Sequence, residues 1–291
     1  MPAAEIDVDA PLVRSLLLSQ HPDLSTLAIR TLSNGWDNAL FRLGREYTVR
    51  LPRRAAAAQL VRHEQRWLPE FSRLTRVSLP LPVRVGQLSP IYPWYWSVSP
   101  WLEGTAVLGL PPGRRNSLAL ALARFIADIH RPAPADAPRN PVRGTALALR
   151  DDAVRARLSA PELAGGGLID LWQELVAAPL WRGPQVWLHG DLHPGNILHR
   201  RGTLTAVIDF GDLTSGDPAT DLATAWMTFD ARDRSVFRRE VTRLCGTDGH
   251  TWRWAQGWAL NIGSALLTHS DDNPPLRRLG EHTLAQVLSE A

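Results

Sequence analysis

The spacing of apolar and polar residues in the first hundred positions predicts a helix followed by a small antiparallel sheet. The first segment carries leucines at helical spacing, with Asp9 as its N-cap and Pro11 near its start. Short apolar or alternating runs, separated by polar turns, then predict strands. The expected order is a helix at 8–22, strands at 27–32, 38–43 and 47–51, a helix at 55–68, and strands at 80–85 and 95–102.

The remainder of the chain has mainly helical periodicity. A stripe of apolar side chains over residues 117–130 predicts the central helix of a helical region. A proline-rich connection at 131–149 follows, and a loop of this length inside a compact domain is often functional. Further helices are expected at about 150–159, 168–178, 217–229, 231–245, 249–269 and 275–290.

One stretch, residues 186–223, says most about function and reads VWLHGDLHPGNILHRRGTLTAVIDFGDLTSGDPATDLA. Its apolar start at 186–188 breaks into a polar turn that contains Asp191 and Asn196 and is followed at once by an apolar pair. The next apolar run predicts a buried strand that delivers Asp209 at its far end. Two carboxylates and an amide are therefore expected to converge near one hairpin.

These residue types suit phosphoryl transfer, in which a protein positions a hydroxyl and neutralises phosphate charge with metal ions. A carboxylate must accept the hydroxyl proton, while an amide oxygen and a second carboxylate can hold Mg²⁺, a hard ion that prefers oxygen ligands. The spacing H-x-D-x-x-x-x-N followed by D-F-G is that of the kinase catalytic loop, except that Gly190 replaces the usual arginine.

With glycine at that position, the stretch resembles the aminoglycoside phosphotransferase family of small-molecule kinases. The family hallmark is HGD-x-x-x-x-N, then a D-F-G-like turn, then G-D-P-x-x-D, and all three motifs stand here in order. The resemblance implies an α+β, protein-kinase-like bilobal fold, with an N-terminal antiparallel sheet lobe at 1–104 and a mainly helical C-terminal lobe at 105–291. The cofactors implied are Mg²⁺ and, as co-substrate, ATP or GTP.

The resemblance also assigns roles within the stretch. Asp191 is expected to be the catalytic base, and Asn196 and Asp209 the magnesium ligands. The loop is expected to be supported by His189, His193 and Asp221, the last of which would tie the helix after the G-D-P motif back to the loop.

The same resemblance places the nucleotide on the N-terminal lobe. The hairpin over the phosphates is expected at Ser33, Asn34, Gly35 and Trp36, although one glycine replaces the usual glycine-rich run. The purine is expected beside a hinge formed by Trp101 and Leu102, which could supply apolar walls.

A further departure from the family concerns Arg50, which stands where family kinases usually have lysine. By the two-residue strand period, Thr48 and Arg50 face the same side of their strand. Arginine keeps the positive charge but binds phosphate oxygens as a planar fork, so the choice between ATP and GTP stays open. We expect Glu64 on the following helix to pair with Arg50.

The helices after residue 217 are expected to form the acceptor side. The acceptor is a small molecule with a hydroxyl group, either an aminoglycoside-like or macrolide-like antibiotic or a metabolite. Acidic residues of these helices commonly meet cationic antibiotics in the family, and the nearest candidates are Asp212, Asp230 and Asp233. Three tryptophans, Trp252, Trp254 and Trp258, could line an apolar pocket or belong to the core.

Composition narrows the remaining function classes. The chain has 291 residues, 44% of them hydrophobic, which suffices for one large domain or two lobes. All 32 basic residues are arginine, so a Walker A lysine, a lysine Schiff base and a pyridoxal phosphate attachment are excluded. The net charge is only +3 and arginines alternate with acids, so no nucleic-acid partner is expected.

The compartment is expected to be the cytoplasm. The single cysteine, Cys245, excludes an intramolecular disulfide. The chain opens without a basic start or a long apolar run, so neither a secretory signal nor a membrane span is expected. We expect a monomer or a weak dimer.

Two alternatives stay open. Asp191 and His193 also form the D-x-H fragment that begins metallophosphoesterase sites, but His130, His199 and His250 stand singly and suggest no second ligand cluster. The other alternative is a kinase-like module that binds a nucleotide without turnover, which the arginine at the lysine position and the glycine-poor hairpin leave possible.

Overall fold

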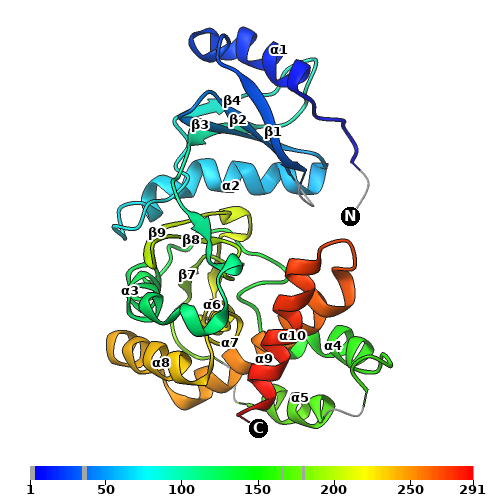
Figure 1. Cartoon of the computed structure of the whole chain (residues 1–291), viewed down its shortest axis with the longest axis vertical. Coiled ribbons are helices and arrows are strands. Elements are labelled where there is room, and N and C mark those ends of the chain that lie inside the picture. The colour runs from blue at the N-terminus through cyan, green and yellow to red at the C-terminus, as the bar shows by residue number, and fades with distance from the viewer. Residues whose placement is uncertain (1–3, 35–37, 165–166, 179–180, 291) are drawn as a thin grey trace. The chain divides into compact units, whose positions relative to one another are not determined.

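The computed structural model of the protein describes residues 4–34, 38–164, 167–178 and 181–290. The chain divides into two compact units. The sheet unit consists of residues 1–103 and 209–211, and the helical unit consists of residues 104–208 and 212–291. In Figure 1 the strands β1 to β4 are drawn in the blue to cyan colours of the N-terminal part of the chain, and most helices are drawn in the green to red colours that follow.

The sheet unit is built on a five-stranded antiparallel sheet in the order β1-β2-β3-β5-β4. Phe41, Val49 and Val98 are paired across three neighbouring strands and therefore point to one face, where they are buried. The strands are β1 (Ile29–Asn34), β2 (Asn38–Leu43), β3 (Tyr47–Pro52), β4 (Arg84–Gly86) and β5 (Trp96–Pro100).

Two helices flank this sheet (Figure 1). Helix α1 (Ala10–Gln20) contributes leucines to the core on the Phe41 face, and its N-cap is Asp9, as predicted, which accepts from the Leu12 amide at 2.8 Å. Helix α2 (Ala55–Phe71) lies against the other face, where the Gln65 amide donates to the Ser97 hydroxyl at 2.9 Å. Arg50 is paired with Ser97 in the sheet and so shares the α2 face.

The expected strands at 27–32 and 80–85 differ from the observed ones for local reasons. Pro22–Leu24 forms a short 3₁₀ turn, and the Leu27 amide then donates a hydrogen bond to the Leu24 carbonyl. The chain up to residue 27 is therefore in a turn, and β1 begins at Ile29. Two prolines at 80 and 82 have no amide hydrogen to donate to a ladder, so β4 begins only at Arg84.

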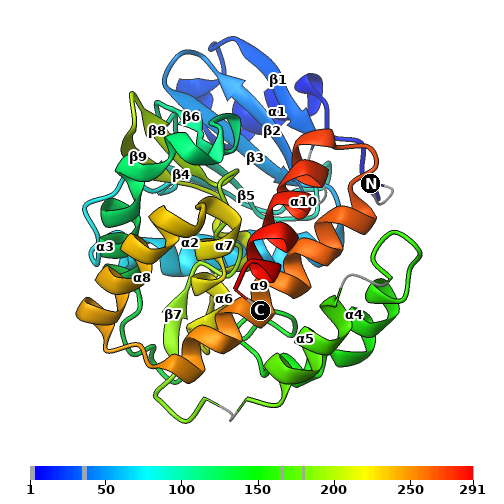
Figure 2. The ribbon, with the colours of Figure 1, turned by 60° about the horizontal axis from the view of Figure 1, so that its bottom comes forward.

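The helical unit is organised around α9, whose tryptophans Trp254 and Trp258 are buried and belong to the core. Helix α10 packs along α9 (Figure 2). None of the described helices combines the length and apolarity needed to cross a bilayer. The helices are α3 (Ala119–Ile129), α4 (Asp151–Leu158), α5 (Leu168–Val176), α6 (Ala219–Leu222), α7 (Thr224–Thr228), α8 (Ala231–Cys245), α9 (Gly249–His269) and α10 (Pro274–Leu288).

Short strands hold the central stretch in place. Strand β8 (Ile197–Arg200) lies between β6 (Thr105–Ala106) and β9 (Thr203–Val207). Strands β8 and β9 form the hairpin expected from the sequence. Strand β7 (Val186–Leu188) pairs with β10 (Thr214–Gly216). The expected helix at 217–229 is instead two short helices, α6 and α7, that meet at Ala223.

Packing of α10 on α9 generates a stability prediction. A Cβ atom at Gly280 would lie 2.7 Å from the Leu267 amide nitrogen and 2.8 Å from the Gly263 carbonyl oxygen. We expect Gly280→Ala to lower the free energy of unfolding by about 2 kcal/mol, because these backbone atoms cannot move aside as a side chain can. Urea denaturation measures the change. Gly249→Ala is the matched control, since its Cβ would meet no atom within 4 Å, and equal losses in both variants would contradict the close packing.

Candidate active site

The loop between β7 and β8 is anchored by a buried carboxylate. Asp221 on α6 is fully buried and accepts hydrogen bonds from the His189 amide at 2.8 Å and the Gly190 amide at 2.9 Å. The imidazole of His130, at the end of α3, lies 3.3 Å from the same carboxylate. His130, one of the histidines that stand singly in the sequence, is therefore buried against Asp221.

Gly190 explains why this loop departs from the arginine of the kinase motif. Its φ is +87°, in the region that favours glycine, and a Cβ atom would lie 2.1 Å from the Asp212 carbonyl oxygen. No residue with a side chain fits there without moving the backbone of Asp212. The glycine is therefore dictated by the contact between the loop and the segment after Asp209.

Asp191 lies beside three polar or charged side chains. Arg143 Nη2 lies 3.0 Å from Asp191 Oδ1, His193 Nε2 lies 3.5 Å from Oδ2, and the Asn196 amide donates to the Asp191 carbonyl at 2.9 Å. Burial alone would raise the pKa of Asp191, but the adjacent His193 and Arg143 outweigh it and hold that pKa well below its usual range. The carboxylate is thus ionised and can accept a proton.

The two histidines of the loop are held by backbone groups. The amide of Asp191 donates to His189 Nδ1 at 3.2 Å, so the proton of this imidazole is assigned to Nε2, which donates to the Ile208 carbonyl at 2.9 Å. In the same way the Gly195 amide donates to His193 Nδ1 at 3.0 Å and leaves Nε2 facing Asp191. These hydrogen bonds therefore fix the tautomer and the orientation of both rings within the loop.

Asn196 and Asp209 have oxygens that suit a hard cation. Asn196 is buried and its Nδ2 donates to Asp191, so Oδ1 is the atom of this side chain that could hold a cation. Its carbonyl accepts from the Ile208 amide at 2.9 Å, directly before Asp209 in the chain. Asp209 has an unusual φ of +65° and a side chain that is 53% exposed. Mg²⁺ is commonly bound by one or two carboxylates together with substrate phosphates, and an amide oxygen with a carboxylate is chemically suited to this mode of binding.

A larger metal cluster does not occur in the part of the chain that the structure describes. No group of three or more histidine, cysteine, aspartate or glutamate side chains there is arranged to hold a metal ion. His199, one of the single histidines, accepts from the Gly202 amide through Nδ1 at 3.3 Å.

Two residues of the proline-rich connection join the site and were not expected from the sequence. The Asn140 amide donates to Asp212 Oδ1 at 2.7 Å, and Arg143 Nε lies 3.9 Å from Asp212 Oδ2. The connection is fixed on β10, because the Asn140 amide nitrogen donates to the Thr214 hydroxyl at 2.9 Å and the Ser215 amide donates to a carbonyl of the connection. In the sequence, only the length of the proline-rich connection indicated that this segment could contribute to the site.

The three acidic acceptor candidates lie in two places. Asp212 accepts from Asn140 and lies near Arg143, which also contacts Asp191. Asp230 is the N-cap of α8 and accepts from the Asp233 amide at 3.0 Å. Asp233 is buried next to it, and burial, together with the charge of Asp230, raises the pKa of Asp233.

In the sheet unit, Arg50 holds two carboxylates with one guanidinium. Nη1 lies 2.6 Å from Glu64 Oε1, so the expected pair is present, and Nη2 lies 3.1 Å from Asp209 Oδ1. When the Asn38 amide is assigned so that its oxygen faces Arg50, this oxygen accepts from Nη2 at 2.8 Å. Burial would lower the pKa of Arg50, but Glu64 and Asp209 outweigh burial and raise it. A lysine has a single nitrogen and could not reproduce this fork.

The other nucleotide candidates are only partly described. Gly35 and Trp36 lie outside the described residues, while Ser33 is exposed on β1 and is paired with Leu40. Asn34 ends β1, where its backbone is paired with Ala39.

The residues expected near the purine are engaged within the sheet unit. The Thr48 hydroxyl donates to the Ser99 carbonyl at 3.4 Å. The Trp101 amide donates to the Glu46 carbonyl at 2.6 Å, and the Arg42 guanidinium stacks 3.6 Å from the centre of the Trp101 ring. Leu102 is half-buried. The Trp101 amide is therefore already engaged within the sheet unit.

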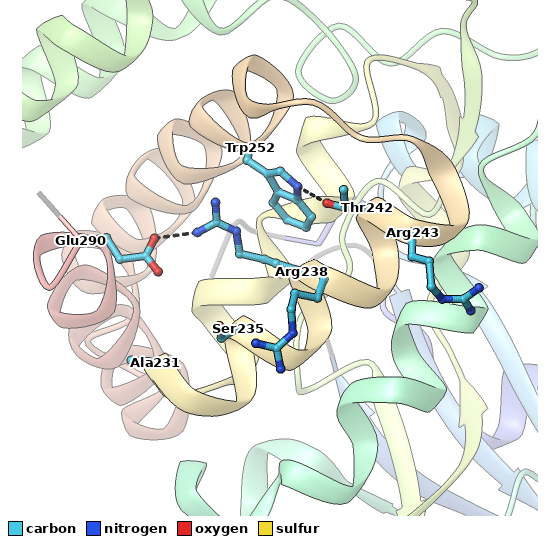
Figure 3. A pocket seen from close by; sticks show the side chains of 8 residues that line it. Ala231, Ser235, Arg238, Thr242, Arg243, Trp252 and Glu290 are labelled. Carbon is cyan, nitrogen blue, oxygen red and sulfur yellow. Dashed lines mark hydrogen bonds and ion pairs between the residues drawn. The ribbon is translucent and has the colours of Figure 1, made fainter.

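A cavity of about 590 Å³ on α8 contains none of the predicted site residues (Figure 3). Its charges are largely paired, because Arg238 lies 3.1 Å from Glu290 and over the ring of Trp252, and Arg243 lies 2.8 Å from Glu240. The lining residues are Ala231, Ser235, Arg238, Arg239, Thr242, Arg243, Trp252 and Glu290.

Asp217 in the G-D-P motif generates a pH prediction. It is buried, Oδ1 accepts from the Ala219 amide, and Oδ2 has no hydrogen-bond partner among the residues that the structure describes. Burial, with a contribution from Asp248, raises the pKa of Asp217 to about 7. Because the folded state then binds a proton that the unfolded state has lost, this group stabilises the fold at low pH, and that stability is lost as pH rises from about 4 to about 7.

We therefore expect Asp217→Asn to gain stability relative to the unmodified protein as pH rises. The difference in free energy of unfolding should grow by about 2 kcal/mol between pH 5 and pH 8, measured by urea denaturation. Asp152→Asn, on the exposed side of α4, controls for the loss of a carboxylate. An equal difference in the free energy of unfolding at pH 5 and at pH 8 would contradict the raised pKa of Asp217.

The Arg50 fork generates a stability prediction. Arg50→Met should lower the free energy of unfolding by about 3 kcal/mol, because it leaves the buried Glu64 carboxylate without its main counter-charge. The double variant Arg50→Met, Glu64→Met should recover a large part of this loss, since the buried Glu64 carboxylate is then absent as well, while the exposed Asp209 carboxylate can be hydrated. Thermal and urea denaturation of the single and double variants measure the coupling. Strictly additive losses would contradict the ion pair.

The chain is similar to known phosphotransferases in sequence and in fold. The model of the Phosphotransferase enzyme family matches residues 28–258. The GDP and kanamycin complex of an aminoglycoside phosphotransferase is similar at 21% identity, with 96% of this chain and 98% of that chain covered and a TM-score of 0.70. A macrolide 2′-phosphotransferase from Brachybacterium faecium is similar at 20% identity, with 95% and 98% covered and a TM-score of 0.62. A comparison with curated protein sequences gives no significant match.

These structural likenesses confirm the predicted α+β kinase-like fold, with its N-terminal antiparallel sheet and mainly helical C-terminal region. The family match extends over most of the chain and includes the loop around Asp191, the turn at Asp209 and the G-D-P motif. The protein therefore belongs to the phosphotransferase enzyme family and is a phosphotransferase.

Proposed function

We propose that the protein transfers the γ-phosphoryl group of ATP or GTP to a hydroxyl group of a small molecule of the aminoglycoside-like or macrolide-like kind, with Mg²⁺ as cofactor. The observation that carries this proposal is the ionised Asp191, which is partly exposed on a loop whose backbone is fixed by Asp221. Solved structures similar to this chain contain GDP, ATP or ADP, and some contain kanamycin, gentamicin or streptomycin, which supports a nucleotide and a hydroxylated acceptor.

In the proposed reaction the acceptor oxygen forms a bond to the γ-phosphorus while the bond from that phosphorus to the β,γ-bridging oxygen breaks. The acceptor proton passes to an Asp191 carboxylate oxygen. Because the pKa of Asp191 is low, this carboxylate orients the hydroxyl and takes its proton only as the new bond forms. The fixed loop holds the base in one place, so that little reorganisation is needed when the acceptor arrives.

The nucleotide phosphates are proposed to lie near Arg50, Thr48 and the hairpin that begins at Ser33. Asn196 Oδ1 and the Asp209 carboxylate would hold Mg²⁺. When bound, this ion neutralises the charge of the β- and γ-phosphate oxygens. We place the reaction in the cytoplasm, where nucleoside triphosphates are available, and expect a monomer or weak dimer without a nucleic-acid partner.

We expect Asp191→Ala to lower acceptor-dependent nucleotide consumption by at least about 100-fold while nucleotide affinity changes little, since the base acts on the acceptor. The assay uses purified protein, Mg²⁺, ATP or GTP, and a panel of aminoglycosides, macrolides and hydroxylated metabolites. Calorimetry measures nucleotide binding in parallel, and Asn196→Ala should weaken only its Mg²⁺-dependent part.

Asp152→Asn serves as the control, because it removes an exposed carboxylate of the helical unit. Full activity of Asp191→Ala would reject its role as base. Nucleotide binding without turnover of any acceptor would instead favour a non-catalytic binding module, and an unchanged Mg²⁺ titration in Asn196→Ala would reject its role as ligand.

A further inference from the structure

One face of the segment 147–158 packs against α9 and carries two arginines. A 3₁₀ turn at Leu147–Arg150 continues directly into α4, and both contact α9, beside which α4 lies in Figure 2. The buried residues of this face are Leu147, Val154 and Leu158. Arg150 and Arg157 stand at helical spacing from these residues, so both side chains start from the packed side of the segment. Two positive charges therefore belong to a face that is otherwise apolar.

Among the described residues, Arg157 is hydrogen-bonded only to neutral groups of α9. Its Nε donates to Ser264 Oγ at 3.1 Å, and its Nη2 donates to Asn261 Oδ1 at 2.5 Å. Ser264 and Asn261 are both buried. Burial and the neighbouring charge of Arg150 lower the pKa of Arg157, and no described carboxylate acts against them. Because a guanidinium remains protonated in proteins, this half-buried side chain keeps its positive charge without a counter-ion.

Arg150 adds a second positive charge at the same contact. Its Nε is buried and has no hydrogen-bond partner among the residues that the structure describes. The next residue is an acid, Asp151, but its carboxylate already accepts from Arg155 Nε at 2.8 Å and from Trp172 Nε1 at 2.7 Å. A buried charge that lacks a partner is costly, and such groups in folded proteins commonly bind water or an ion. The two arginines therefore leave an excess of positive charge between α4 and α9.

The hydrogen-bonding groups that remain available here are donors. The Asn261 carbonyl accepts from Ser264 Oγ at 3.0 Å and from Arg157 Nη2 at 3.3 Å. Within the described part of the chain, Arg157 Nη1, Asn261 Nδ2 and the Arg150 guanidinium then have no acceptor. A guanidinium can donate two parallel hydrogen bonds to two oxygens of a carboxylate or a phosphate. A set of donors with excess positive charge therefore suits a compact oxyanion.

We infer that Arg150, Arg157 and Asn261 form a binding site for a compact oxyanion, a phosphate or carboxylate group, at the contact of α4 with α9. The bound group would pair with both guanidinium groups and offset the repulsion between them. The chemistry is the same for a free ion and for an anionic group of a larger compound, so experiment separates these two sources. None of the three residues belongs to the candidate active site, and the oxyanion site therefore goes beyond the proposed function.

Calorimetry and thermal unfolding of the full-length protein test the site with inorganic phosphate as the probe. The titrations contain neither nucleotide nor Mg²⁺, and sodium chloride keeps the ionic strength constant. Phosphate should bind the unmodified protein and raise its Tm by mass action. Arg150→Gln and Arg157→Gln should each weaken this binding at least about tenfold, because each removes one charged donor, and the rise in Tm should be lost.

Arg150→Gln also separates ligand binding from a structural role. Without phosphate, the Tm of this variant should equal or exceed that of the unmodified protein, because the change removes repulsion from Arg157 and breaks no hydrogen bond of the buried Nε. An arginine with a structural role would lower the Tm when replaced. This comparison still decides the question if Arg157→Gln, which loses hydrogen bonds to α9, does not fold.

Two further variants control for charge and for geometry. Arg253→Gln is the matched control, since it removes from α9 an exposed arginine that lies 3.9 Å from Glu174, and it should leave the phosphate affinity unchanged. Arg157→Lys keeps the charge but has a single nitrogen. It should therefore bind phosphate more weakly than the unmodified protein and more tightly than Arg157→Gln.

Titrations with glycerol 3-phosphate and glycerate identify the source of the oxyanion. These probes carry a phosphate or a carboxylate group on a hydroxylated carbon chain. Tighter binding of inorganic phosphate would assign the site to a free ion, and tighter binding of either compound would assign it to an anionic group of a larger ligand. Both results support the site, provided that Arg150→Gln weakens the binding.

Equal phosphate affinities of the unmodified protein, Arg150→Gln and Arg157→Gln would overturn the proposed site. So would a lack of binding of all three probes to the unmodified protein, or a lower Tm of Arg150→Gln without phosphate. None of these measurements depends on turnover, so a failure of the proposed function would be recognised separately, by the absence of nucleotide consumption with every acceptor.

Discussion

The site depends on the buried carboxylate of Asp221. An ionised group is costly to bury unless it is fully hydrogen-bonded, and Asp221 meets this condition with two consecutive amides of the loop and the imidazole of His130. The same bonds satisfy backbone amides at a turn where no strand or helix can do so. One residue of α6 therefore fixes both the start of the loop and its electrostatics, and Gly190 allows the loop to pack against the backbone of Asp212.

Planar guanidinium groups organise the charges in both units. Arg50 bridges Glu64 and Asp209 in the sheet unit, and Arg143 contacts Asp191 and lies near Asp212 in the helical unit. A chain without lysine must use arginine at both positions, and the fork geometry lets one side chain reach two carboxylates at once. In each case one arginine places a positive charge between two carboxylates.

Local signals predicted the long helices well. The expected ranges 231–245 and 249–269 agree with α8 and α9, because Asp230 and Asp248 cap their starts and Gly246 ends α8. Strand β10 was missed, since its three residues have no apolar pattern and are held by pairing with β7 and by hydrogen bonds to the proline-rich connection. The expected helix at 217–229 was wrong as one element, because apolar periodicity continues through the break at Ala223 between two short helices.

The sequence by itself determined the family, the fold class and the loop, because the motif residues lie close together and their spacing carries the chemistry. It also indicated the Arg50–Glu64 pair, whose members lie on a strand and the next helix. Only the tertiary structure decided that Arg143 meets Asp191, that Asn140 holds Asp212 and that His130 faces Asp221, across separations of 48, 72 and 91 residues. No local pattern encodes such contacts, because they form only when the packing of distant segments brings the side chains together.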